Sequence, residues 1–87
     1  MHPIPGTRAL RTLEAAGRHL NFTRAADELG LTPAAVSYQT KEIEDQLGLV
    51  LYTRTSRSIR PTKAGELMLE ASAEALDVLG RAVARAR

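Results

Sequence analysis

Apolar positions in the first half of the chain recur at helical spacing in three stretches, which are separated by polar or glycine-containing breaks. The first stretch begins at Thr7, a favourable N-cap residue, and ends near residues 19–21. Its predicted buried stripe consists of Leu10, Leu13, Gly17 and Leu20. The second stretch covers residues 23–29 and is followed by Gly30, a residue type that often ends helices with a positive φ. We expect the side chain of Leu31 to pack into the core beneath this turn.

The third stretch, residues 32–47, opens with Thr32 as N-cap and Pro33 at the first helical position, where a missing N–H is tolerated. Counted at about 100° per residue, its predicted buried face consists of Val36, Thr40, Ile43 and Leu47. The opposite face consists of Ala34, Tyr38, Lys41 and Asp45, with Ser37 beside it. The start of this helix is therefore expected to present small and hydrogen-bonding side chains to its surroundings.

The pattern changes after Gly48. The apolar run 49–52 and the apolar Ile59 flank a polar segment, which predicts a two-stranded hairpin with residues 55–58 at its tip. Two strands this short are marginal alone, so we expect them to pack against the helices.

A fourth helix is predicted from the cap Thr62 to the end of the chain, because no proline or turn cluster interrupts residues 63–87. At about 1.5 Å per residue it would be about 38 Å long, more than a small domain can cover. Its heptad stripe consists of Leu69, Leu76, Leu79 and Val83. We expect this stripe to pair with the same helix of a second copy, giving a homodimer. Gly80, unfavourable in a helix interior, would suit a close backbone approach there.

Composition further restricts the type of fold and the kinds of ligand site that this chain can form. The chain has 87 residues, enough for one small domain, and 3% aromatic residues, which favours an aliphatic, helical core. It has no cysteine and only two histidines, too few for a closed structural metal site. We expect no cofactor, no membrane span and a cytoplasmic location.

The net charge of +2 hides a basic segment, residues 54–63, that contains four basic residues and no acidic one. Such a segment is either a solvated loop or a surface for an anionic partner.

Helix 23–29, its glycine turn and helix 32–47 have the spacing of a helix-turn-helix, and the hairpin adds a wing. In this arrangement the N-terminal residues of the second helix meet base edges in the major groove of double-stranded DNA. The predicted base-edge residues are Thr32, Pro33, Ala34, Ser37 and Tyr38. The residues predicted to meet the DNA backbone or minor groove are Asn21, Thr23, Gln39, Lys41, Arg54, Arg57 and Arg60.

These elements carry a family resemblance. The run "NFTRAADELGLTPAAVSYQTKEIEDQLGLVLYTRTSRSIRPTKAG", residues 21–65, resembles the N-terminal DNA-binding domain of LysR-type transcriptional regulators. Its Phe-Thr-x-Ala-Ala, Ala-Val-Ser-x-Gln, Leu-Gly, Leu-aromatic-x-Arg and Thr-x-x-Gly motifs match the family's. The segment "RHLNFTRAADEL" leans toward the branch of glycine-cleavage activators and β-lactamase regulators.

The resemblance implies a mainly α fold: a winged helix-turn-helix over residues 1–61, with a three-helix core and a two-stranded wing, and a linker helix over residues 62–87. It implies pairing through antiparallel linker helices, a possible tetramer of the full-length protein, and binding to interrupted inverted repeats. It further implies that Arg54 and Arg57 approach DNA backbone or minor groove. A C-terminal domain that binds a small-molecule effector is expected in the family and is absent from this chain, so we expect an isolated DNA-binding segment.

Three positions depart from the family pattern. Tyr38 stands where arginine or another long polar residue is usual, so an arginine–guanine contact is not available there. Thr40 replaces the usual isoleucine, and its hydroxyl is expected to donate to the carbonyl of Val36. Pro61 replaces a common leucine and would stiffen the entry to the linker helix.

Two other classes were weighed. Catalysis is not expected, because Ser37 has no nearby histidine and no phosphate loop or metal constellation is present. The acidic cluster of Glu42, Glu44 and Asp45 is interpreted as a solvated helix end. The second alternative is an adaptor that dimerises through its last helix without binding nucleic acid. The basic segment argues against it, and salt-sensitive retention on heparin distinguishes the two.

Overall fold

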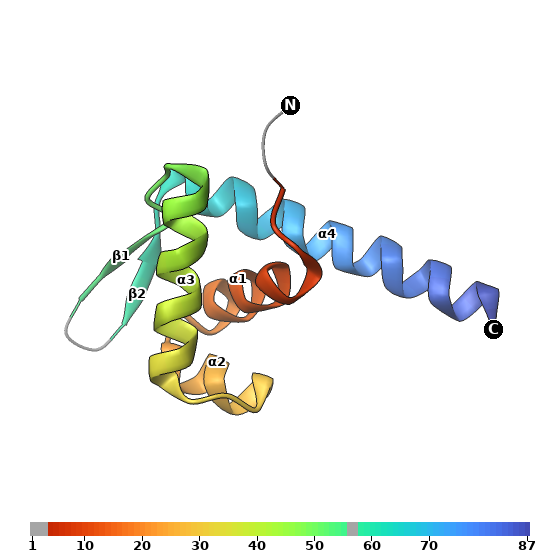
Figure 1. Ribbon diagram of the computed structural model, residues 1–87, viewed down its shortest axis with the longest axis horizontal. Helices are drawn as coiled ribbons and strands as arrows, with labels where there is room; N and C mark the ends of the chain where they lie inside the picture. Colours follow the sequence, from red (N-terminus) through yellow and green to blue (C-terminus); the bar gives the residue numbers. More distant parts are fainter. Residues whose placement is uncertain (1–3, 56–57) are drawn as a thin grey trace.

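The computed structural model describes residues 4–55 and 58–87, and Figure 1 shows their arrangement. The elements in chain order are α1 (Thr7–His19), α2 (Phe22–Leu29), α3 (Pro33–Leu47), β1 (Tyr52–Arg54), β2 (Ile59–Pro61) and α4 (Lys63–Ala86). Three helices form the body, β1 and β2 form an antiparallel wing, and the C-terminal half of α4 projects away from the body. The predicted mainly α, winged helix-turn-helix class is confirmed. No helix in the described ranges is both long and apolar enough to cross a membrane.

The ends of α1 differ from the prediction. Gly6, not Thr7, occupies the N-cap position, and no side chain caps this end. Leu20 takes a left-handed conformation with φ 54° and ends the helix, while its N–H bonds to the carbonyl of Ala16. That backbone change turns the Leu20 side chain out of the helical stripe, so its predicted burial is wrong.

The turn between α2 and α3 is closed by backbone groups. Asn21 caps α2 by accepting from the N–H of Arg24 at 2.9 Å, so α2 begins one residue earlier than predicted. Gly30 has the predicted positive φ, 70°. The N–H of Leu31 donates to the carbonyl of Ala26 at 2.9 Å, but the Leu31 side chain is exposed. The expectation that this side chain packs into the core is wrong, because the hydrogen bond and not apolar contact holds the turn.

Two apolar clusters form the core. The larger one joins α1, α3 and the wing and consists of Leu13, Ala16, Ile43, Leu51, Tyr52 and Ile59. The smaller one joins the three body helices and consists of Ala15, Ala25, Ala26 and Val36. Thr40 lies on the buried face of α3, and its hydroxyl donates to the carbonyl of Val36 at 2.8 Å, as predicted. The hydroxyl of Tyr52 donates to the carbonyl of Leu13 at 2.8 Å, and burial raises the pKa of Tyr52 to about 12.

The wing is shorter at its start than the sequence suggested. Residues 49–51 do not belong to β1, and Leu49 and Val50 are exposed. β1 pairs with β2 in the register Tyr52 to Pro61 and Arg54 to Ile59. The N–H of Thr55 donates to the carbonyl of Ser58 at 2.8 Å and closes the predicted tip. Residues 56–57 lie outside the described part of the chain.

Glu44 is not part of a solvated helix end, as the sequence had suggested. Its carboxylate accepts from the N–H groups of Leu51 at 2.7 Å and Tyr52 at 3.2 Å. Asp45 pairs with Lys41 at 3.2 Å, and both of their side chains are exposed. Glu44 therefore fixes the segment that leads into the wing against the end of α3.

The start of α4 is tied to the same segment. Thr62 caps α4 by accepting from the N–H of Gly65 at 3.0 Å and donates to the carbonyl of Val50 at 2.6 Å. A side chain at Gly65 would overlap the carbonyl oxygen of Leu51, so only glycine permits this approach. At Gly80 an added Cβ would have nothing within 4 Å.

We predict that Gly65→Ala lowers the free energy of unfolding by about 3 kcal/mol, because the clash is with backbone. Gly80→Ala, in the same helix, should raise it by about 1 kcal/mol through helix propensity alone. Chemical denaturation followed by circular dichroism measures both. Equal effects of the two substitutions would contradict the close contact at Gly65.

We predict that Glu44→Ala lowers the free energy of unfolding by about 2 kcal/mol, because two N–H groups lose a charged acceptor. Asp45→Ala is the matched control, since an exposed helical pair contributes only about 0.3–0.5 kcal/mol. The same denaturation experiment compares them, and a Glu44→Ala variant as stable as the control would contradict the role assigned to Glu44.

Candidate nucleic-acid interface

The N-terminal half of α3 is an open surface. Thr32, Pro33 and Ala34 are exposed, Tyr38 is 68% exposed, and Ser37 is half-buried. Thr32 accepts from the N–H of Ala35 at 3.1 Å, so its predicted capping role is confirmed. The structure thus brings the five predicted base-edge residues together at one helix end. The wing lies on one side of α3 and α1 on the other (Figure 1).

Arg54 connects the wing to this surface. Its Nη1 donates to the hydroxyl oxygen of Ser37 at 2.7 Å. Its guanidinium carbon also lies 5.1 Å from the centroid of the Phe22 ring, within the range of a cation–π interaction. Since the oxygen of Ser37 accepts from Arg54, the Ser37 proton is free to be donated elsewhere. Phe22 is the phenylalanine of the Phe-Thr-x-Ala-Ala motif but was not among the predicted site residues, because its contact with Arg54 joins positions 32 apart in the chain.

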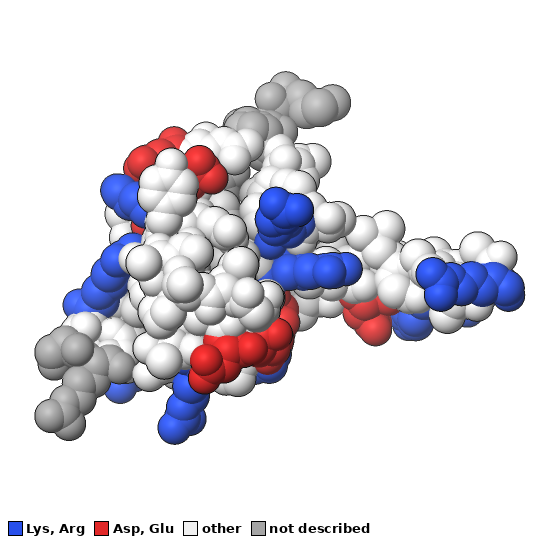
Figure 2. Space-filling view, turned by 60° about the horizontal axis from the view of Figure 1, so that its bottom comes forward, with Lys and Arg blue, Asp and Glu red and all other residues white. Residues whose placement is uncertain are grey.

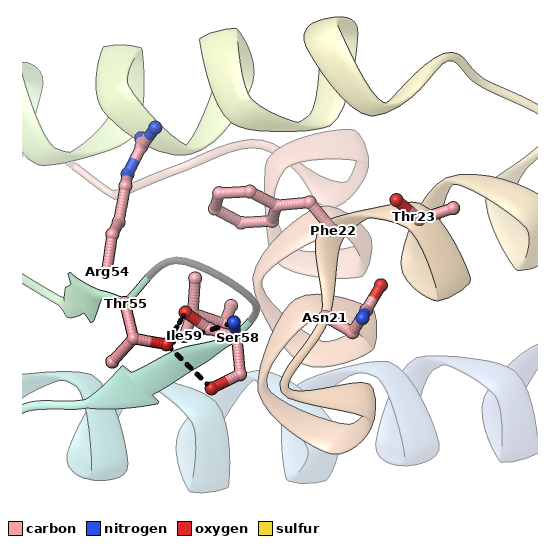
Figure 3. A pocket seen from close by; sticks show the side chains of 7 residues that line it. All are labelled: Asn21, Phe22, Thr23, Arg54, Thr55, Ser58 and Ile59. Atoms are coloured by element: carbon pink, nitrogen blue, oxygen red, sulfur yellow. Dashed lines mark hydrogen bonds between the residues drawn. The ribbon is translucent and has the colours of Figure 1, made fainter.

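A shallow pocket lies between the wing and the start of α2 (Figure 3). Its lining consists of Asn21, Phe22, Thr23, Arg54, Thr55, Ser58 and Ile59. Asn21 and Thr23 therefore line the same pocket as Arg54. The side chain of Asn21 is already engaged as the α2 cap. Arg60 is exposed on β2, and Arg57 lies outside the described residues.

On the opposite flank of α3, Gln39 meets α1. The hydroxyl of Thr12 lies 2.7 Å from Oε1 of Gln39. Sequence reasoning placed Gln39 toward one side of the helix but missed Thr12, because this contact joins residues far apart in the chain. Lys41 lies further along α3 in its exposed pair with Asp45.

Charge is distributed unevenly around this region. Figure 2 shows an uncharged centre with basic side chains at several points around it and acidic side chains in separate groups. In one acidic group, Arg18 bonds to Glu14 at 2.6 Å and to Glu28 at 2.6 Å. Hydrogen bonds from Arg18 and then His19 lower the pKa of Glu28 to about 2. These contacts join the end of α1 to α2 and partly offset the negative charge there.

The predicted dimerisation stripe divides into two parts. Leu69 is half-buried and faces Gly17 of α1, where an added Cβ would lie 2.7 Å from its methyl carbons. Leu76 is half-buried beside a groove that α4 forms with Thr7 and Arg11 of α1. Leu79 and Val83 border the same groove and are 49% and 52% exposed. The first part therefore packs within the chain, while the second part leaves apolar surface uncovered.

A helix-turn-helix with a two-stranded wing and a long trailing helix defines the class of this protein. Residues 7–66 match the family model described as bacterial regulatory helix-turn-helix protein, lysR family. The chain belongs to the LysR family.

Individual relatives agree with this assignment. The chain is 54% identical over 63 residues to the glycine cleavage system transcriptional activator of Escherichia coli (strain K12), covering 72% of this chain and 21% of that protein. It is 48% identical over 69 residues to the HTH-type transcriptional activator AmpR of Pseudomonas aeruginosa, covering 79% of this chain and 23% of AmpR. The chain thus spans about a fifth of these relatives' length. The predicted lean toward this branch is consistent with both.

Among solved structures, the DNA-binding domain of CbnR in its DNA complex superposes with a TM-score of 0.88 at 31% identity, covering 95% of both chains. The BenM domain in complex with benA site 1 DNA gives a TM-score of 0.88 at 28% identity, covering 94% of this chain and 92% of that one.

Proposed function

We propose that this chain is the DNA-binding part of a transcriptional regulator that binds double-stranded DNA sequence-specifically as a homodimer on an interrupted inverted repeat. The observation that carries the proposal is the open N-terminal half of α3, which presents small and hydrogen-bonding side chains between a basic wing and α1. Support comes from the similar CbnR and BenM domains, whose structures are DNA complexes. The similar proteins of known function are transcriptional activators.

In this proposal α3 enters the major groove, where bulk at its start would block entry. The residues that meet base edges are Thr32, Pro33, Ala34, Ser37 and Tyr38. Ser37 can act as a hydrogen-bond donor, because the bond from Arg54 uses a lone pair of its oxygen and leaves the hydroxyl proton unused. The base atoms that can accept this bond are purine N7, guanine O6 or thymine O4.

The flanks of α3 would meet the sugar–phosphate backbone or the minor groove. The residues in this role are Asn21, Thr23, Gln39, Lys41, Arg54, Arg57 and Arg60. Their contribution is affinity and salt dependence more than discrimination between sequences. Arg57 is assigned from its place in the sequence, between the two strands of the wing.

The homodimer would form through the uncovered part of α4. Leu79 and Val83 supply the exposed apolar surface, and Leu76 borders it. In the longer protein, a separate domain would bind a small-molecule effector and the assembly could extend to a tetramer. The protein would then act in the cytoplasm on the nucleoid.

Selection of bound duplexes from a random-sequence pool at physiological salt tests DNA recognition directly. We predict that Ser37→Ala lowers the affinity ratio between the enriched duplex and random duplex about fivefold, for one lost hydrogen bond.

Arg57→Ala should weaken binding to both duplexes alike and reduce the salt slope by about one. Fluorescence anisotropy at several salt concentrations measures both quantities. No enrichment and no binding at low salt would favour the adaptor function, and a change in preference from Arg57→Ala alone would reverse the assigned roles.

Val83→Asp tests the dimer. It places a charge in the proposed seam and should weaken self-association on the order of a hundredfold. The body should stay folded, because the Val83 side chain is 52% exposed. Val83 is a cleaner target than Leu76, because Leu76 is half-buried. Ala84→Asp adds the same charge one position away, outside the heptad stripe, as a control. Sedimentation equilibrium reports the masses, and a Val83→Asp variant that is still dimeric would exclude this seam.

A further inference from the structure

One polar contact joins a buried hydroxyl of α1 to a half-buried side chain of α3. Thr12 is only 1% exposed, and its hydroxyl oxygen lies 2.7 Å from Oε1 of Gln39 and 3.2 Å from the carbonyl oxygen of Arg8. A buried hydroxyl needs a partner, and the carbonyl one turn back on its own helix would satisfy it without Gln39. The side chain of Gln39 instead reaches across to α1 to accept from it.

The two distances decide where the single proton of Thr12 goes. Hydrogen bonds between two oxygens are commonest at about 2.7–2.8 Å, and about 3.2 Å lies beyond their usual range. Thr12 therefore donates to Gln39. The carboxamide of Gln39 is then oriented, with Oε1 turned toward α1 and Nε2 turned away from that contact.

The surroundings of Gln39 leave its Nε2 available as a hydrogen-bond donor. Gln39 borders a cleft between the start of α1 and α3, together with Gly6, Arg8, Ala9, Glu42 and Ile43. Nε2 has no hydrogen-bond partner among the described residues. Ser37 and Gln39 come one position before and one position after Tyr38, about 100° to either side of it around the helix, so they lie on opposite flanks of α3 when Tyr38 faces the groove. Arg8 favours an anion in this cleft, whereas the Glu42 carboxylate disfavours it.

We propose that Thr12 is a positioning residue for DNA binding: by accepting a hydrogen bond from the Thr12 hydroxyl, the Gln39 carboxamide presents Nε2 as a donor to a DNA phosphate on the α1 side of α3. A phosphate only accepts hydrogen bonds, so a carboxamide turned the other way would repel it. This inference rests on the proposed DNA-binding function and assigns a role to a residue outside the recognition helix.

The test compares Thr12→Val, which keeps the shape and removes the hydroxyl, with Thr12→Ser, which keeps the hydroxyl. Binding is measured by anisotropy on the enriched duplex and on random duplex at several salt concentrations, using the whole 87-residue chain. Thr12→Val should weaken both complexes about fivefold. The salt slope should not change, since a neutral amide releases no counterion. Thr12→Ser should bind like the unaltered protein.

A double-substitution cycle separates positioning from a general effect on the fold. Gln39→Ala should weaken binding to a similar extent, and Thr12→Val should have no further effect in that background. Gln39→Glu keeps an acceptor for Thr12 but places a carboxylate before the phosphate, so it should weaken binding more than Gln39→Ala. Because Gln39 is half-buried, Gln39→Glu tests the proposal without a substitution in the core.

Three outcomes would overturn the inference: unaltered affinity of Thr12→Val, an equal loss from Thr12→Val with and without Gln39, or unaltered affinity of Gln39→Glu. Each requires that the unaltered chain binds the duplex. Failure of the unaltered chain to bind would instead overturn the proposed function itself, so the two failures are distinguishable.

Discussion

The structure depends on the close packing of α2 against α1 and α3, which alanines make possible. Ala15, Ala25 and Ala26 are fully buried around Val36. No buried side chain in this cluster is larger than valine, and the larger Phe22 and Leu29 are only partly buried beside it, so the helices approach closely. Because cores are packed tightly, a longer side chain at any of these positions would displace α3. These small buried residues therefore determine where the exposed N-terminal half of α3 lies.

Polar contacts then hold α3 along its length. Near its start the Ser37 hydroxyl accepts from Arg54 of the wing, and Gln39 accepts from Thr12 of α1. Near its end the carboxylate of Glu44 accepts from the backbone that leads into the wing. Each contact joins α3 to a different part of the chain, and the first two also determine which way the hydrogen-bonding groups of α3 face. The same bonds that stabilise the fold therefore prepare its proposed function.

The features that were predicted correctly depend on neighbouring residues. The helix-turn-helix spacing, the Gly30 turn, the Thr32 and Thr62 caps and the Thr40 back-bond all follow from local patterns. The error at Leu20 arose where a left-handed backbone turned an apolar side chain out of its helical stripe, and the error at Leu31 arose because a backbone hydrogen bond closes the turn. Glu44, Phe22 and Thr12 were misread or missed because their roles depend on partners brought close only by folding. For the same reason a heptad pattern could not show that Leu69 packs on α1 while Val83 stays exposed.

The central claim is that two copies of α3 occupy the major groove of one duplex. The direct test replaces each purine of the enriched duplex in turn with its 7-deaza analogue, which removes the N7 acceptor of the major groove and leaves the minor groove unchanged. We predict that affinity falls at two groups of positions, one in each arm of the repeat and separated by about 10 base pairs or a multiple of that. Loss at a single group would contradict the dimer, and no loss at any position would contradict contacts between α3 and purine N7 in the major groove.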